Sequence, residues 1–399
     1  MSNQISDPKP HKARDTSPEP RKPVLRRTRF VLVSDTHNAT PHLPRGDVLI
    51  HAGDITNRGT QKELSRSIQW LEKADFEAKI VIAGNHDVTL DADFYARQGH
   101  ALHAQQSQDP QACKALLTSS SSLIYLEHSS QQIKLTSPQG PRTTFTIFGS
   151  PFSPRDPAHD PSFGAFTYPA PPLHDLSPST TRSPSDLPSL WDAIPLDADV
   201  VVTHTPARTH LDEAPSRRAK GCEALRRALW RVRPRLAVCG HVHEARGVER
   251  VTWDLDCGNV AFKEAGITPW DDPGVEGRKM SVVGLGGRNG SPLQNDGSRG
   301  LDHVEKQETG DALRIPPAGI DEAGPPITPG THPTIGTLGL GGRDPSSMRC
   351  DTVALLGRTG RRETCFVNCA IMATSYPQTG GRVMNKPIVV DIDLPAWDE

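Results

Sequence analysis

Long apolar runs are missing from this sequence of 399 residues. No stretch approaches the ~20 apolar residues that a membrane-spanning helix requires, and the first residues lack the short apolar run of a signal peptide. We therefore expect an intracellular, cytoplasmic protein with no membrane partner. A large excess of one charge is missing too, because 45 basic and 47 acidic residues give a formal net charge of −2. Without a basic stripe to contact phosphates, a nucleic-acid partner is not expected.

Apolar and aromatic residues are scarce. Hydrophobic residues make up 35% of the sequence and aromatic residues 5%, while 37 prolines and 33 glycines together exceed one residue in six. Such a composition predicts a folded core that is diluted by disordered segments. The seven cysteines are odd in number and scattered in spacing, which favours reduced, mostly buried thiols over a zinc knuckle.

The chain divides into four regions by composition. Residues 1–28 are rich in Pro, Lys, Arg and Ser and predict a disordered N-terminal arm. Residues 29–261 contain short β-branched runs and predict the main part of a folded domain. Residues 262–363 are dominated by Gly, Pro, Asp and Thr and predict a largely disordered insertion, in which residues 275–345 supply neither ligands nor core. Residues 364–399 regain apolar runs and predict C-terminal strands that complete the domain.

Short aliphatic and β-branched runs predict buried strands. They are expected at 30–33, 48–50, 80–82, 123–126, 131–135, 143–148, 200–202, 236–238, 248–255, 365–367 and 388–392. Apolar residues at helical spacing predict helices at 61–73, 107–120 and 221–230. The Pro- and Ser-rich stretch 151–188 is expected to be loop. Strands that alternate with helices indicate an α/β fold with parallel, buried central strands.

Histidine, aspartate and asparagine follow several of these runs, at the points where the strands would end. The residues concerned are Asp35, His37, Asp54, Asn85, His86, Asp87, His204, His241 and His243. Loops that leave the carboxyl ends of strands in an open α/β sheet converge on one edge, where ligands bind. We therefore expect these side chains to meet in a single site.

The residue types predict a metal site. Imidazole and carboxylate groups suit first-row transition metals such as Mn, Fe and Zn. One cation can use both Asp35 and His37, because alternate residues of an extended segment face the same way. The carboxylate of Asp54, at a tight Gly-Asp turn, can bridge two cations. Two ions about 3.5–4 Å apart can clamp the oxygens of a phosphoryl transfer, and a hydroxide between them is a nucleophile at neutral pH.

The ordered motifs resemble those of the calcineurin-like metallophosphoesterases, and more narrowly of the metallophosphoesterase-domain-containing subgroup. The resemblance rests on VSDTHN (33–38), GDVLIHAGDITNRG (46–59), IVIAGNHD (80–87), FGSPF (148–152), VVTHTP (201–206), GCEAL (221–225), GHVHE (240–244) and FVN (366–368). It covers about residues 29–260 and 364–395. It implies a four-layer sandwich of two mixed β-sheets flanked by helices.

The resemblance also implies a role for each residue. The implied ligands are Asp35, His37 and His243 for the first of two divalent ions, and Asn85, His204 and His241 for the second, with Asp54 bridging both. His86 would be the general acid for the leaving oxygen or would stabilise the charged phosphorane. Asp87 would orient His86 from behind.

The expected activity is hydrolysis of a small phosphoester by a metal-bound hydroxide, and the resemblance implies phosphodiesters, including cyclic nucleotides, as substrates. Two alternatives stay open: a catalytically weak nucleotide-binding or scaffold protein on the same fold, and a nuclease of the same superfamily. Asn38, Asn57 and Arg58 lie in the ligand loops, where they either contact substrate or cap turns and stay solvated. His51 precedes Asp54 and is expected to pack beneath the site.

Overall fold

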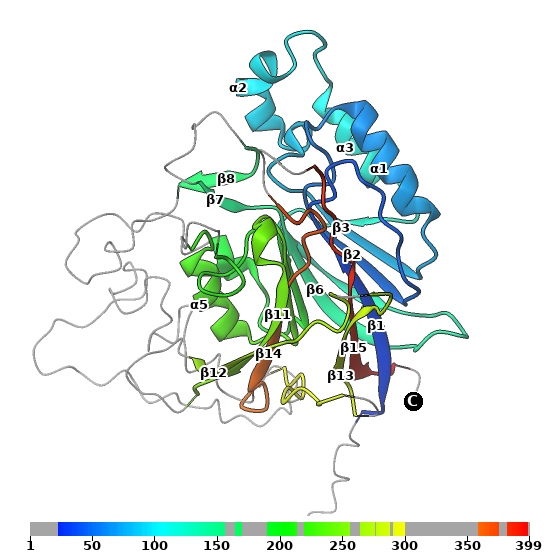
Figure 1. Ribbon diagram of the computed structural model, residues 1–399, viewed down its shortest axis with the longest axis vertical. Coiled ribbons are helices and arrows are strands. Elements are labelled where there is room, and N and C mark those ends of the chain that lie inside the picture. The colour runs from blue at the N-terminus through cyan, green and yellow to red at the C-terminus, as the bar shows by residue number, and fades with distance from the viewer. Residues whose placement is uncertain are drawn as a thin grey trace, which may run out of the picture.

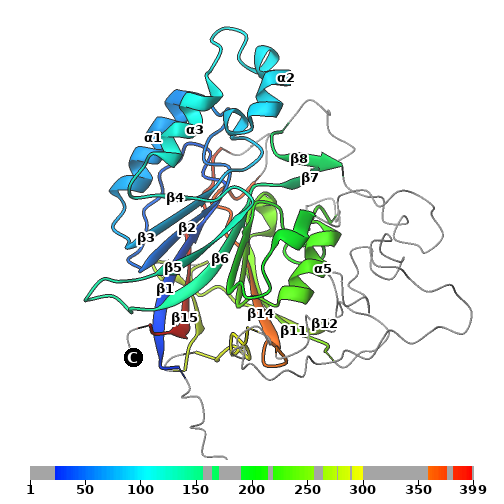
Figure 2. The ribbon, with the colours of Figure 1, turned by 180° about the vertical axis from the view of Figure 1, so that it is seen from behind.

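Two β-sheets that pack face to face, with helices on their outer faces, form the body of the molecule (Figures 1 and 2). They are seen in a computed structural model, which describes residues 23–155, 164–169, 190–213, 219–255, 264–275, 277–287, 290–299, 358–374 and 381–397.

The first sheet has six strands, most of them parallel. Its order is β13 (Ser281–Leu285), β15 (Ile388–Pro395), β1 (Leu25–Val33), β2 (Val48–Ala52), β3 (Ala78–Ile82) and β4 (Ile124–Tyr125). β1 runs antiparallel to β15, whereas the other neighbouring strands are parallel. The sheet is therefore mixed, as the motif resemblance implies.

The second sheet has seven strands and is also mixed. Its order is β12 (Glu264–Pro269), β11 (Gly247–Trp253), β14 (Glu363–Asn368), β10 (Leu236–Cys239), β9 (Val200–Thr203), β6 (Thr144–Ser150) and β5 (Ser129–Lys134). β14, β10, β9 and β6 are mutually parallel neighbours, and the outer strands are antiparallel. Two short strands, β7 (Ser153–Arg155) and β8 (Thr167–Pro169), pair with each other.

Helices complete the four layers. The helices beside the first sheet are α1 (Gln61–Lys73), α2 (Ala92–Leu102) and α3 (Pro110–Thr118), and α5 (Glu223–Val232) covers the second (Figures 1 and 2). Short 3₁₀ turns occur at η1 (Val88–Leu90), η3 (Trp191–Ala193) and η4 (His243–Ala245). The four-layer α/β sandwich is thus confirmed.

The core follows from the two-residue period of the strands. In β1, Phe30 and Leu32 face the second sheet, while Val31 and Val33 face the helices. The ring of Phe30 packs edge-on against that of Phe145 in β6, with ring centroids 5.2 Å apart. Because both faces of β1 are buried over residues 30–33, this half of the strand reads as a continuous apolar run.

Local sequence fixes where α1 begins. Thr60 caps its N-terminus, because the Thr60 hydroxyl accepts from the Glu63 amide while the Glu63 carboxylate accepts from the Thr60 amide. The apolar stripe of Leu64, Ile68 and Leu71 is buried, as its spacing predicts. This cap also fixes the loop that leads into α1 from Asp54.

The structure differs from the expected region boundaries. β1 begins at Leu25, inside the stretch 1–28 that we expected to be a disordered arm. β12 and β13 lie inside 262–363, and the side chains of Val283 and Leu285 are buried in the core between the sheets. β13 becomes a strand because the free edge of β15 accepts it in parallel register.

Other expectations fall partly outside the described residues. Residues 1–22 and 300–357 lie outside them, so the expected disorder there stays a prediction. The helix expected at 107–120 is present as α3, and α2 precedes it without having been expected. Within 151–188, the described residues include β7 and β8.

The described cysteines agree with the expectation of reduced, mostly buried thiols. Cys113, Cys222, Cys239, Cys365 and Cys369 are buried and carry free thiols. The remaining two, Cys257 and Cys350, lie outside the described residues. Among the described helices, none combines the length and apolar character that crossing a bilayer would need.

Candidate metal centre

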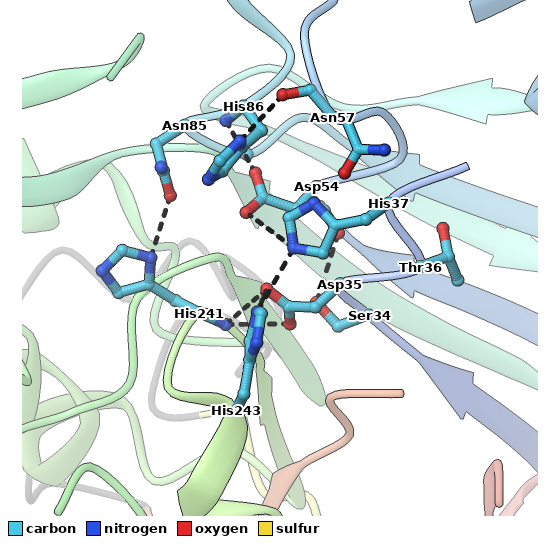
Figure 3. A network of polar contacts seen from close by, with 12 residues as sticks. Ser34, Asp35, Thr36, His37, Asp54, Asn57, Asn85, His86, His241 and His243 are labelled. Atoms are coloured by element: carbon cyan, nitrogen blue, oxygen red, sulfur yellow. Dashed lines mark hydrogen bonds and ion pairs between the residues drawn. The ribbon is translucent and has the colours of Figure 1, made fainter. Parts of the chain in front are cut away.

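The seven expected ligands come together at one edge of the two sheets, and Figure 3 labels all of them except His204. They leave the carboxyl ends of five strands: Asp35 and His37 after β1, Asp54 after β2, Asn85 after β3, His204 after β9, and His241 and His243 after β10. These strands run parallel within each sheet, so their carboxyl ends share an edge. The fold therefore delivers ligands from both sheets to one point.

Backbone strain is concentrated at this edge. Asp35, His37, Asp54 and His241 have left-handed φ angles of 52°, 44°, 53° and 68°. For residues with a side chain such conformations cost on the order of 1–3 kcal/mol each, and they cluster at functional sites. These turns direct the ligand side chains toward a common centre, and the strained backbone lowers the stability of the fold.

Two glycines make room for the carboxylates. A Cβ atom on Gly84 would lie 2.3 Å from Oδ1 of Asp54, and one on Gly240 would lie 2.2 Å from Oδ2 of Asp35. Both separations are far below van der Waals contact. The Gly-Asn and Gly-His pairs of the motifs are therefore required for the close approach of each loop to the opposite carboxylate.

His37 and His243 face each other in a way that fits a shared cation. Nδ1 of His37 lies 3.2 Å from the Thr56 carbonyl oxygen, and Nδ1 of His243 lies 3.1 Å from the Thr374 carbonyl oxygen. A carbonyl only accepts, so both Nδ1 atoms carry the proton. The two Nε2 atoms are 3.2 Å apart. In neutral rings both Nε2 lone pairs point to the same place. The separation of the two atoms matches that of two nitrogens that bind the same ion, each at about 2.1 Å.

Asp35 completes this first position. Its side chain is fully buried, and its Oδ1 lies 3.3 Å from Nε2 of His243. The amide of His241 donates to the same carboxylate at 2.9 Å. Ligand atoms of Asp35, His37 and His243 all lie within 4.8 Å of one another. The set contains two imidazoles and one carboxylate, which suits a first-row transition metal.

Asn85 organises the second position. Its Oδ1 lies 3.0 Å from Nε2 of His204 and 2.9 Å from Nδ1 of His241. Nδ1 of His204 is 2.9 Å from the Ala52 carbonyl oxygen, so Nε2 is the atom that His204 presents. His241 presents Nδ1 instead. An amide oxygen and two imidazole nitrogens therefore meet here.

Asp54 lies between the two positions. Its Oδ2 is 3.4 Å from Nε2 of His204 and 3.8 Å from Nε2 of His37, and its Oδ1 accepts from the His86 amide at 2.8 Å. Asp54 shares one candidate ligand group with Asp35 and His204, and another with His37 and His86. Its carboxylate therefore lies within reach of both candidate metal positions.

The electrostatics of the buried centre call for cations. Burial would lower the pKa of His204, but Asp54 outweighs it and raises this pKa to about 9. Burial is likewise outweighed at His243, where Asp35 raises the pKa to about 9. His241 differs, because burial and the neighbouring His204 lower its pKa to about 3. Two buried carboxylates are thus compensated by positive charge, which bound metal ions would supply in place of protons.

His86 stands at the rim, above Asp54 (Figure 3). Its Nδ1 lies 2.9 Å from the Asn57 carbonyl oxygen, and its ring packs edge-on against that of His37 with centroids 4.8 Å apart. Because Asn57 fixes the proton on Nδ1, Nε2 is the atom that can exchange a proton with a substrate. The expected general-acid role fits this placement.

The contacts of Asp87 lie with the loop after Asp54, and its expected role in orienting His86 stays a prediction. Its buried carboxylate accepts from the amides of Ile55, Thr56 and Gly84 and from the Thr56 hydroxyl. These bonds hold the loop after Asp54, which carries Asn57. The Asn57 carbonyl therefore positions His86, and Asp87 acts one step further back.

The residues expected to contact substrate differ in their hydrogen bonds and in their exposure. Nδ2 of Asn38 donates to Oε1 of Glu63 at 2.7 Å, so Asn38 ties the first ligand loop to α1. Asn57 contacts His86 through its carbonyl. The side chain of Arg58 is exposed beside the same loop. His51 is fully buried and its Nε2 lies 2.9 Å from the Thr36 hydroxyl, so it packs beneath the site.

Sequence reasoning missed several groups around the centre. The carbonyls of Ala52, Thr56 and Thr374 fix the histidine tautomers, and no residue type signals such a backbone role. Lys220 was also missed; its ammonium adds to the lowering of the pKa of His241, after burial and His204. Lys220 directly precedes the GCEAL motif (221–225), and this neighbourhood is the only feature of the sequence that could have pointed to it.

Comparison with known proteins agrees with this geometry. The family model for calcineurin-like phosphoesterases matches residues 28–245. The chain is 40% identical over 229 residues to a "Probable rhamnogalacturonate lyase C" of Emericella nidulans, covering 57% of this chain but 18% of that protein. It is 34% identical over 253 residues to human "Metallophosphoesterase domain-containing protein 1", covering 61% and 67% of the two chains.

A third relative is a UPF0046 protein of Caenorhabditis elegans, 31% identical over 239 residues, with 59% of this chain and 69% of that protein covered. The chain thus spans under a fifth of the lyase-named protein and about two thirds of the other two. The matched region contains all seven expected ligands. This chain belongs to the calcineurin-like phosphoesterase family.

Proposed function

We propose that this protein is a metal-dependent phosphodiesterase with a dinuclear centre, and that its substrate is a small phosphodiester such as a cyclic nucleotide. One observation carries the proposal: Asp54 lies between two ligand groups, one of which has two Nε2 atoms 3.2 Å apart with their tautomers fixed. The ions we propose are Mn, Fe or Zn, from the nitrogen and oxygen donors.

The residues around the centre have different roles in the proposed reaction. When bound, a pair of divalent ions lowers the pKa of water and stabilises charge on phosphoryl oxygens. Asp35, Asp54, Asn85 and the imidazoles would hold these ions, and Asp54 would be shared between them. As the imidazolium, His86 keeps its Nδ1 proton on the Asn57 carbonyl and gives its Nε2 proton to the leaving oxygen, which leaves a neutral imidazole. Lys220 and Arg58 are the cations that we propose to hold the rest of the anionic substrate.

The test is a substrate and metal screen on the full chain. Chelator-treated protein is reloaded with Mn, Zn, Fe or Mg and assayed with an aryl phosphodiester, an aryl phosphomonoester, cyclic nucleotides and single-stranded DNA. We expect metal-dependent phosphodiester hydrolysis that Asp54→Asn abolishes. Metal binding without hydrolysis of any substrate would favour the scaffold alternative, and preferred hydrolysis of DNA would favour the nuclease.

A further inference from the structure

The loop that carries His241 and His243 has an unusual support. In the second sheet β14 lies between β10 and β11, although β10 and β11 are consecutive in the sequence. Asn368, the last residue of β14, is in register with Cys239 on one side and Gly247 on the other. The loop from β10 to β11 therefore has to pass over the end of β14, at Asn368.

The side chain of Asn368 holds this loop from below. It is fully buried, and its Nδ2 donates to the carbonyl oxygens of Val242 at 2.9 Å and Leu211 at 3.1 Å. Its Oδ1 accepts from the Ala370 amide at 3.2 Å. Val242 separates His241 from His243, and these two belong to different metal positions. One amide group thus fixes the peptide between the two ligands.

The residues after Asn368 reach the other sheet. The Ser34 amide donates to the Cys369 carbonyl at 3.0 Å, and the Ile371 amide donates to the Ser34 carbonyl at 2.9 Å. Ser34 directly precedes Asp35. The Thr374 carbonyl then accepts from Nδ1 of His243. Segment 368–374 therefore touches the ligand loops of both sheets, although it lies well outside residues 28–245, which the family model matches.

We propose that Asn368 is a positioning residue of the metal centre, acting through Val242 to set the spacing of His241 and His243. The inference rests on the proposed dinuclear centre. Mutation of a group that hydrogen-bonds and orients a metal ligand typically lowers the metal affinity about 10–100-fold. A purely structural asparagine would change stability and leave that affinity alone.

Asn295 provides a matched control. It is also buried, and its Nδ2 also donates to two carbonyl oxygens, those of Arg233 at 3.0 Å and Glu363 at 2.8 Å. Glu363 is the first residue of β14 and Asn368 the last, so Asn295 contacts one end of the strand and Asn368 forms the other. Replacing each by alanine removes the same group in a similar environment, near the centre in one case and far from it in the other.

The experiment is calorimetric titration of Mn²⁺ into the chelator-treated full chain, with a thermal melt of each variant. We expect Asn368→Ala to bind Mn²⁺ about 10–100-fold more weakly than wild type, and Asn295→Ala to lower the melting temperature without changing the affinity. Asn368→Ser, which keeps one donor, should fall between and serves if Asn368→Ala does not fold. Unchanged affinity in the folded Asn368 variants overturns the inference. If the wild type binds none of Mn²⁺, Zn²⁺ and Fe²⁺, the proposed function fails instead.

Discussion

Nδ1 of His86 lies 2.9 Å from the carbonyl oxygen of Asn57. This contact leaves Nε2 of His86 to face the substrate, on a ring that packs against His37. The imidazole therefore stands next to the proposed metal positions with a defined tautomer. This placement suits His86 to proton transfer.

His86→Ala should keep bound metal and lose turnover by about 10²–10⁴-fold, the usual worth of a general acid. The loss should shrink for aryl esters with very acidic leaving groups, which depart without a proton. The measurement is kcat across a series of leaving groups, together with metal content. His100→Ala, at an exposed position on α2, is the control. An equal loss across the series would argue for charge stabilisation instead of proton donation.

The edge strand β12 should dock in a pH-dependent way. Nδ1 of buried His210 lies 2.5 Å from Glu249 and its Nε2 lies 3.2 Å from Glu264, which also pairs with Arg226 at 2.6 Å. Burial alone would lower the pKa of His210, but both glutamates outweigh it and raise this pKa. Burial raises the pKa of Asp212, and the charge of His210 is among the effects that oppose this rise.

Because the folded state holds this proton more tightly, His210 should contribute stability that is complete below its unfolded pKa of about 6.5. The contribution should disappear as the pH rises through the raised pKa of the folded state. The measurement is the free energy of unfolding of wild type minus that of His210→Gln, in urea, from about pH 6 to 9. The difference cancels groups common to both proteins. A difference that stays constant over this range would contradict the assignment.

Removal of residues 300–357 should be tolerated, whereas removal of 275–345 should not. The flanking residues already touch, since the Asp296 amide donates to the Gly360 carbonyl at 3.2 Å and Nε of Arg361 donates to the Ser298 carbonyl at 2.6 Å. A short Gly/Ser linker can therefore join them, and each doubling of loop length changes closure by only about 0.6 kcal/mol.

The longer deletion also removes β13, whose Val283 and Leu285 are buried between the sheets. Truncating one such side chain typically costs about 2–5 kcal/mol. Thermal melts and metal analysis of both deletion variants are the measurement. We expect a melting temperature near that of wild type for the shorter deletion and a large drop for the longer one. The opposite order would show that the anchoring contacts around Arg361 are dispensable.

The ligands could be predicted because each follows a buried strand. Asp35, Asp54 and His204 stand at strand ends, and parallel pairing alone brings those ends together. Their orienting partners could not be predicted. The Thr374 carbonyl reaches His243 across 131 positions of sequence, and a carbonyl is common to every residue.

The edges of the fold were harder to predict than its centre. Ser281–Leu285 is a short stretch that contains Gly284, and it forms a strand only because β15 offers a free edge. The composition around it favoured disorder. The partners of Asp87 could not be predicted for a related reason, because the sequence places it beside His86 while four donors from other segments and from Gly84 bind its carboxylate.

The central claim is that Asp54 bridges two metal ions. The most direct test is elemental analysis of the metal-loaded full chain, comparing wild type, Asp54→Asn and the control Asp93→Asn, which alters an exposed residue on α2. We predict two ions per chain in wild type and in the control. Asp54→Asn, which keeps the shape but removes the charge, should retain at most one ion and lose nearly all phosphodiester hydrolysis. Two ions per chain in an active Asp54→Asn protein would contradict the account.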